Sequence, residues 1–182
     1  MSSLNFKRIN RILKYKANRV KVYLDEYERP DKKHVFYDYV ENKNGAGVLL
    51  IDQNGDLILI KQYRITLDRC DLEIAAGSID KGEDYHEAAI REAEEETGYI
   101  PGKLVAVNNI IGSVGLFSER TMVYIGSDLK KGCIRRDPDE FMEIVTISLD
   151  KALHMINEGE ICDSKTIIAI LYYALNKNVI FK

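Results

Sequence analysis

The segment Gly77–Tyr99, GSIDKGEDYHEAAIREAEEETGY, places four glutamates within five residues of one expected helix. Asp84 followed by Glu87 has the pattern of a capping box, and Gly98 is suited to end the helix in a left-handed turn. We therefore expect a helix over residues 84–97. Like charges at helical spacing destabilise a helix by roughly 0.2–0.5 kcal/mol per pair, so this gathering of acids needs a physical reason.

The glutamates converge on one side of that helix. Each residue advances by about 100°, so Glu92, Glu95 and Glu96 share a stripe while Glu94 points elsewhere. A salt-bridged surface helix would carry Lys or Arg four residues after a Glu, yet Glu96 follows Glu92 at that spacing. Because Mg²⁺ prefers oxygen ligands, the stripe also suits a divalent-cation site. The cluster by itself leaves both interpretations open.

The spacing of the surrounding residues is more specific. Gly77, five residues, Glu83, seven residues and the run Arg91–Tyr99 (REAEEETGY) resemble the Nudix box, G-x5-E-x7-R-E-U-x-E-E-x-G-U, where U is bulky and aliphatic. Every fixed position is matched, whereas the two U positions hold Ala93, which is small, and an aromatic tyrosine. Seven identities at fixed spacing make this motif far more specific than a lone GxGxxG.

The resemblance implies a metal site. Glu92 and Glu96 are the expected principal ligands, Glu95 is a further ligand or an outer partner, and the backbone carbonyl of Ala76 completes the coordination. Mg²⁺ is the expected ion, and Mn²⁺ is a candidate substitute. The glutamates would then be crowded because bound ions, rather than lysines, neutralise them.

The resemblance also implies an internal ion pair between two other residues of the box. Arg91 and Glu83 are expected to fix the loop against the helix. The catalytic set implied by the resemblance is Glu119, Glu95 and Arg91, with Glu119 in a loop that closes on substrate binding and serves as general base for the attacking water. A loop glutamate that only faces solvent is the alternative for Glu119.

Flanking residues resemble the ADP-ribose pyrophosphatase and nucleotide-sugar branch of the family. There a Q-Y/F-R element precedes E-hydrophobic-x-A-G, here residues 62–64 (QYR) and 73–77 (EIAAG). The resemblance implies that Arg64, together with Gln62, binds the diphosphate; an arginine at a strand end that faces water is the alternative. The segment 160–166 (EICDSKT) also resembles that branch, which has an acidic-x-x-D-x-K-T pattern there.

The loop GSVGLFSER at residues 112–120 departs from the branch. Val114 stands where an S-P-G proline, the usual marker for ADP-ribose, is expected. This departure does not affect the residues expected to catalyse hydrolysis, but it leaves the identity of the substrate open.

The order of the expected strands and helices along the rest of the chain predicts a mixed α+β fold. Residues up to about 65 are rich in β-branched and aromatic residues, and two apolar runs flank Asn54-Gly55, the pair that a tight primed hairpin turn prefers. Further strands are expected within residues 103–115, 120–129 and 140–149, and helices over residues 149–159 and from about Asp163. The resemblance implies an α/β/α sandwich with a mixed sheet. We expect an N-terminal β-rich region, residues 1–44, and a Nudix hydrolase domain, residues 45–182, and the resemblance to the branch implies that the N-terminal region forms a homodimer.

Composition excludes several functional classes. A formal net charge of −3 gives no basic footprint for nucleic acid, and no apolar run is long enough to span a bilayer. The N-terminus lacks the apolar core of a secretory signal, and the three cysteines show no CxxC spacing, so we expect a cytoplasmic protein without a disulfide framework or a zinc site.

The reaction implied by the resemblance is Mg²⁺-dependent hydrolysis of the diphosphate of ADP-ribose, or of a related nucleoside diphosphate sugar, by metal-activated water. From ADP-ribose the products would be AMP and ribose 5-phosphate. The alternatives are a pyrophosphatase for GDP-mannose or another nucleotide sugar, and a nucleotide-sensing module without catalysis. Such a module is expected to lose box acids, and this chain keeps all of them.

Overall fold

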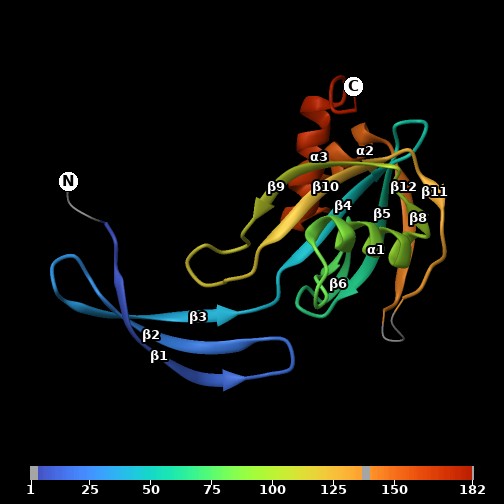
Figure 1. The fold of residues 1–182 in the computed structure, drawn as a ribbon. Coiled ribbons are helices and arrows are strands. Elements are labelled where there is room, and N and C mark those ends of the chain that lie inside the picture. Colours follow the sequence, from blue (N-terminus) through green and yellow to red (C-terminus); the bar gives the residue numbers. More distant parts are fainter. Residues whose placement is uncertain (1–3, 137–139, 182) are drawn as a thin grey trace. The chain divides into compact units, whose positions relative to one another are not determined.

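The computed structural model describes residues 4–136 and 140–181 (Figure 1). The chain divides into two compact units, one containing residues 1–44 and 111–120 and the other containing residues 45–110 and 121–182. The boundary expected from the sequence lies between residues 44 and 45. The structure adds the loop 111–120, with Val114 and Glu119, to the N-terminal unit.

The N-terminal unit is an antiparallel sheet of β1 (Lys7–Lys16), β2 (Lys21–Glu28) and β3 (His34–Glu41). Its loop is attached to β3 by two backbone hydrogen bonds, from Val40 N to Leu116 O (2.9 Å) and from Ser118 N to Val40 O (3.0 Å). The expected N-terminal β-rich lobe is confirmed.

One buried carboxylate organises this small sheet. Asp25 is 1% exposed and accepts hydrogen bonds from Arg11 Nε (2.6 Å) and Nη2 (2.5 Å). The Arg11 guanidinium also lies 3.8 Å from the centroid of the Tyr39 ring. A bidentate pair of this kind holds the pKa of Asp25 below its usual value, mainly through the hydrogen bond from Arg11.

The larger unit contains a mixed sheet in the order β12-β5-β4-β10-β9, in which β4 and β10 are parallel and the other neighbouring pairs are antiparallel. β6 pairs with β5, β7 pairs with β4, and β8 pairs with β11. These strands are β4 (Gly45–Ile51), β5 (Leu57–Arg64), β6 (Arg69–Glu73), β7 (Ala75–Ser78), β8 (Tyr99–Ile100), β9 (Lys103–Ile110), β10 (Thr121–Ser127), β11 (Lys130–Lys131) and β12 (Met142–Ile147).

Helices cover both faces of this sheet (Figure 1). Every residue of β4 is buried, and its side chains alternate between two cores. Leu49 and Ile51 pack with α2 (Leu149–Asn157) and α3 (Ser164–Asn176), whereas Val48 and Leu50 pack with α1 (Tyr85–Thr97). The α/β/α sandwich and the mixed α+β class are confirmed. None of the helices in the described part of the chain has the length and apolar character needed to cross a bilayer.

The hairpin between β4 and β5 is present, but the primed turn expected for it is wrong. A primed turn of that type needs positive φ at both central residues, and among the two only Gly55 has it, at 84°. The loop is longer than two residues because the Asp52 carboxylate accepts hydrogen bonds from the backbone N of Asn54 (2.8 Å) and of Asp56 (2.9 Å). Asp52 thereby stabilises a wider turn than the Asn-Gly pair alone would favour.

We predict that Asp25→Asn lowers the local stability of the N-terminal sheet by about 2 kcal/mol at neutral pH. The loss is smaller than the roughly 3–5 kcal/mol of a fully buried broken pair because the Arg11 side chain is 24% exposed. Amide hydrogen exchange in β1–β3 measures it, and Asp31→Asn, which removes an exposed pair with Arg29, is the matched control.

The same pair predicts a pH dependence. Because the folded-state pKa of Asp25 is below the unfolded value of 3.8, its contribution is present above that value and is lost as the pH falls through the folded-state pKa. Equal protection of wild type and Asp25→Asn at neutral pH would contradict this account.

Candidate active site on helix α1

The ends of α1 are fixed as the sequence predicts. Glu87 N donates to Asp84 Oδ1 (2.8 Å) and Asp84 N donates to Glu87 Oε2 (3.1 Å), which completes the capping box. At the other end Gly98 adopts φ 72°, and its N donates to Glu94 O (2.8 Å). The buried face of the helix is rich in alanine, so α1 lies close to the sheet, and Glu96 is among the buried residues of the helix.

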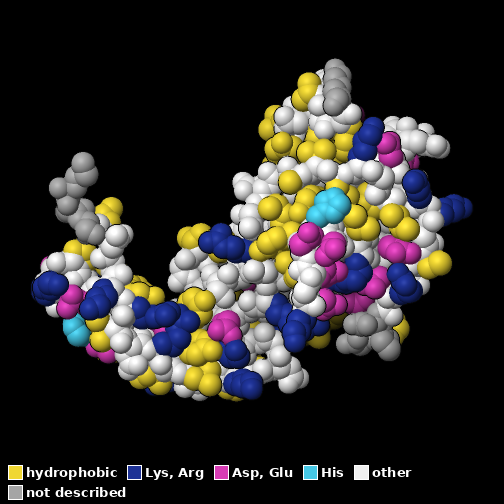
Figure 2. Space-filling model, viewed as in Figure 1, with side chains coloured by type: hydrophobic (Ala, Val, Ile, Leu, Met, Phe, Trp, Pro, Cys, Tyr) yellow, Lys and Arg dark blue, Asp and Glu magenta, His cyan; other side chains and the backbone are white. Residues whose placement is uncertain are grey.

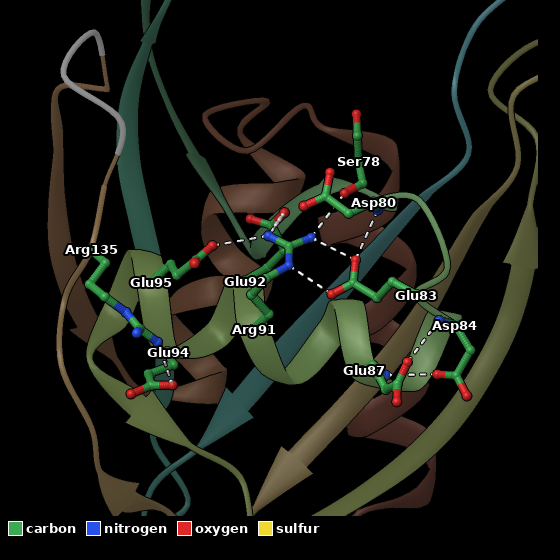
Figure 3. Close-up of polar contacts among 10 residues, drawn as sticks. All are labelled: Ser78, Asp80, Glu83, Asp84, Glu87, Arg91, Glu92, Glu94, Glu95 and Arg135. Carbon is green, nitrogen blue, oxygen red and sulfur yellow. Dashed lines mark hydrogen bonds and ion pairs between the residues drawn. The ribbon is translucent and has the colours of Figure 1, made fainter.

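Arg91 lies at the centre of the site, and several carboxylates point toward its guanidinium (Figure 3). Its Nε and Nη2 donate to the two carboxylate oxygens of Glu83 (2.7 and 3.0 Å), which confirms the predicted ion pair. Nη2 also donates to the backbone carbonyl of Ser78 (3.0 Å), and Nη1 donates to Glu92 Oε1 (2.8 Å) and Glu95 Oε2 (3.0 Å). One side chain therefore joins the Gly77–Gly82 loop to the helix. Acidic side chains gather at the surface over α1 in the space-filling view (Figure 2).

Gly77 is required by a close approach of Glu92. A Cβ atom built on Gly77 would lie 2.0 Å from Glu92 Oε1, far inside van der Waals contact. The Glu92 side chain is 12% exposed, so it has little room to move away. The glycine of the box thus makes space for a carboxylate, in addition to shaping the loop.

Glu96 is the most deeply buried of the box acids, with 4% exposure. Its Oε2 accepts a hydrogen bond from Ala76 N (2.9 Å). Burial, followed by the charge of Glu92, raises the pKa of Glu96 to about 8, and burial also raises the pKa of Glu92 despite the hydrogen bond from Arg91. Two acids held together out of water are unfavourable as a pair of anions, and a divalent cation would relieve that cost.

The donor chemistry fits a hard cation, although the side chains do not converge as a finished cage. Within residues 4–136 and 140–181, no group of three or more His, Cys, Asp or Glu side chains is arranged so that it could hold an ion. Arg91 takes one oxygen each of Glu92 and Glu95, and the contact made by Ala76 is through its N–H. The assignment of Glu92, Glu95, Glu96 and the Ala76 carbonyl as metal ligands therefore stays a prediction.

Arg64 lies at the end of β5 in a network of charges. Its Nε and Nη2 donate to the Glu73 carboxylate, with Nη2 at 2.7 Å, and Glu73 is 4% exposed. Gln62 lies two residues earlier, half-buried, opposite Met142 of β12. Arg64 keeps 39% of its side chain exposed, so it is anchored at one edge and open at another. Binding of diphosphate by Arg64 and Gln62 stays a prediction.

Glu119 belongs to the N-terminal unit. It accepts a hydrogen bond from Asn42 Nδ2, and Val114 in the same loop is 86% exposed. Its role as general base stays a prediction.

Two residues that shape the site, Arg136 and Glu140, were not expected from the sequence. Arg136 donates from Nη2 to Glu96 O (2.7 Å) and from Nη1 to Met142 O (2.7 Å), so it fixes the end of α1 to β12. The charge of Glu140 raises the pKa of both Glu92 and Glu96. Both residues lie far from the box in sequence and carry no local pattern that could have revealed them.

Comparison with known proteins places the chain in a family. The model of the NUDIX domain matches residues 41–167. The chain belongs to the NUDIX family. The match covers β4 to the start of α3, and with them the whole site on α1.

Three relatives with assigned names are similar to this chain over most of its length. An ADP-ribose pyrophosphatase of Bacillus subtilis (strain 168) is 33% identical over 97% of both chains. A methanol dehydrogenase activator of Bacillus methanolicus is 34% identical over 87% of this chain and 86% of its own. A GDP-mannose pyrophosphatase of Klebsiella pneumoniae is 33% identical over 71% of this chain and 70% of its own. The predicted enzyme class, a pyrophosphohydrolase of this family, is confirmed.

A solved structure described as an ADP compounds hydrolase has the same fold. It superposes with a TM-score of 0.86 at 22% identity and covers 98% of each chain. At that identity the likeness concerns the fold.

We predict that Glu96→Gln lowers kcat for diphosphate hydrolysis by at least about a hundredfold while the thermal unfolding midpoint is retained. Glutamine keeps the shape and the hydrogen bond from Ala76 but cannot supply the negative charge that the carboxyl group would carry with an ion bound. The matched control is Glu94→Gln on the same helix, which lies off the stripe and pairs with Arg135. Near-normal turnover by Glu96→Gln would refute its assignment as a ligand.

Gly77→Ala tests the close approach of Glu92. We expect a loss of about 1–3 kcal/mol in the free energy of unfolding, because the added methyl group must displace a confined carboxylate. Gly112→Ala, whose Cβ would meet nothing within 4 Å, is the control. Denaturant unfolding followed by circular dichroism measures both, and equal stability of the two variants would contradict the packing argument.

Proposed function

We propose that the protein hydrolyses the diphosphate bond of ADP-ribose in a Mg²⁺-dependent reaction, with one water molecule consumed and AMP and ribose 5-phosphate released. The observation that carries the proposal is the complete box, in which Glu96 is buried, Glu92 is only 12% exposed and burial raises the pKa of both, so a pair of anions there would be unfavourable without a cation. The Bacillus subtilis relative, named an ADP-ribose pyrophosphatase, is similar over almost the whole chain and supports this substrate.

Each site residue has a role in this proposal. Glu92, Glu96, Glu95 and the Ala76 carbonyl would hold Mg²⁺, or Mn²⁺ in its place. A bound divalent ion supplies Lewis-acid polarisation of the phosphoryl oxygens and a lower pKa for coordinated water. Arg91 keeps the Glu83 loop and the helix acids in register.

The substrate and the proton are assigned to three further residues. Arg64, with Gln62, binds the diphosphate through donors that Glu73 leaves free. Glu119, brought in with its loop, accepts the proton of the attacking water. In the described arrangement Asn42 holds the Glu119 carboxylate, so this step requires that the hydrogen bond to Asn42 be exchanged for one to water.

A related nucleotide sugar is the second candidate substrate. Val114 occupies the position of the ADP-ribose marker proline, and the Klebsiella pneumoniae relative is named a GDP-mannose pyrophosphatase. A nucleotide sensor without catalysis is the third, although every box acid is retained.

We also propose that the protein acts in the cytoplasm as a homodimer joined through its N-terminal unit. The β1 strand leaves large apolar side chains open: Ile9, Ile12, Leu13 and Tyr15 are 43–61% exposed. A second copy of the chain would cover them, and analytical ultracentrifugation of wild type and Leu13→Asp tests this.

The deciding assay is product release from ADP-ribose, GDP-mannose, UDP-glucose, NADH, diadenosine polyphosphates and nucleoside triphosphates, with Mg²⁺ and again with EDTA. We expect metal-dependent cleavage of ADP-ribose above the rest, and loss of activity in EDTA. Preference for another nucleotide sugar would make Val114→Pro the next variant to test. Tight nucleotide binding without cleavage of any compound would overturn the hydrolase proposal in favour of the sensor.

A further inference from the structure

Glu73 is a carboxylate shared by two cations. One of its oxygens, Oε2, accepts hydrogen bonds from both Arg64 Nη2 (2.7 Å) and Lys165 Nζ (2.7 Å), while Oε1 accepts from Arg64 Nε. The Glu73 side chain is 4% exposed and that of Lys165 is 18% exposed, so water screens these contacts poorly. Glu73 Oε2 on β6 therefore links the charge of Arg64 on β5 to that of Lys165 on α3.

Lys165 is itself held firmly at the start of α3. Its Nζ donates to Asp163 Oδ1 (2.9 Å), and the other oxygen of this N-cap residue accepts from Thr166 N (2.9 Å) and Oγ1 (2.5 Å). Thr166 Oγ1 in turn accepts from Ile74 N (2.9 Å), next to Glu73. The lysine ammonium is thus fixed relative to the strand that leads into the Nudix box.

The charge balance around Arg64 depends on Lys165. Arg64 and Lys165 carry two positive charges, and Glu73 and Asp163 carry two negative charges, so the four groups are neutral together. Without the lysine they would carry a net charge of −1 beside an arginine that is expected to receive a diphosphate. The same loss would leave Arg64 as the sole partner of a buried carboxylate.

The geometry of Arg64 leaves donors for a second anion. Glu73 takes Nε and one N–H of Nη2, whereas a guanidinium has five N–H donors in a planar fork. Glu73 thus leaves three N–H donors of Arg64 unused, and 39% of the side chain is exposed. These donors can bind a phosphoryl oxygen only if the guanidinium keeps this orientation. In addition, the positive charge of Arg64 must not be fully neutralised by Glu73.

We propose that Lys165 is a positioning residue for diphosphate binding: by sharing Glu73, it holds Arg64 in place and keeps the positive charge of Arg64 available to the phosphates of the substrate. The inference rests on the proposed function of Arg64. In this proposal Lys165, at the start of α3, contributes to substrate binding as well as to the packing of the helix.

The test compares Lys165→Met with Lys151→Met, an exposed lysine of α2, in the full-length protein with Mg²⁺. For Lys165→Met we expect KM for the hydrolysed nucleotide sugar to rise by at least about tenfold while kcat changes by less than about threefold, because ground state and transition state lose the same contact. Lys165→Arg should restore KM to within about threefold of wild type. Lys151→Met should leave both constants unchanged.

A double-mutant cycle separates positioning from general destabilisation. Arg64→Ala should raise KM, and Lys165→Met added to it should raise KM no further, because the lysine acts through the arginine. Additive effects, or an effect of Lys165→Met on kcat and thermal stability alone, would overturn the proposal. If Lys165→Met does not fold, Lys165→Gln, which retains a donor without the charge, takes its place.

Titration calorimetry with inorganic pyrophosphate and Mg²⁺ gives a readout that needs no turnover. We expect the Kd to rise by at least about tenfold in Lys165→Met and not in Lys151→Met. Pyrophosphate binding with this pattern but no cleavage of any nucleotide would refute the proposed hydrolysis and support the role of Lys165. Active wild type with an unchanged Kd in Lys165→Met would refute the role of Lys165 alone, and wild type that neither binds pyrophosphate nor cleaves a nucleotide would refute both.

Discussion

The five hydrogen bonds of the Arg91 guanidinium join parts of the box that would otherwise repel one another or move apart. Ser78 ends β7 and Glu83 lies between β7 and α1, whereas Glu92 and Glu95 lie on the helix. The guanidinium is a fixed planar fork, so it sets both the distance and the angle between these segments. The remaining acid, Glu96, accepts a hydrogen bond from Ala76 N instead, and burial, followed by the charge of Glu92, raises its pKa.

Burial on both sides of β4 gives the site a closely packed support. Alternate residues of that strand belong to two cores, one closed by α1 and one by α2 and α3. β7, which contains Gly77, pairs with β4, so the loop of the box starts from the most buried strand of the sheet. Because close packing resists displacement, we expect β4 to hold the start of this loop in place.

The charges of Arg64, Glu73 and Lys165 form a second constraint beside the first. The Glu73 side chain is only 4% exposed, so its contacts with Arg64 and Lys165 are strong. Removing one partner would be unfavourable, because an unpaired buried charge is costly. The chain thereby couples the start of α3, some ninety residues away from Glu73 in sequence, to the strand that enters the box. This coupling gives the last helix a role that its apolar composition does not suggest.

The sequence by itself determined the helix with its caps, the Arg91–Glu83 pair and the family, because these depend on short spacings within one element or loop. The order of the elements also determined the mixed α+β class, and the resemblance to the family implied the sandwich. Only the tertiary structure decided that Glu73 is shared by Arg64 and Lys165, that Arg136 holds the end of α1, and that residues 111–120 join the N-terminal unit. The Asn-Gly turn belongs with these, since a neighbouring aspartate overrode the local preference. Contacts of this kind depend on which distant segments the core brings together, and spacing along the chain carries no record of them.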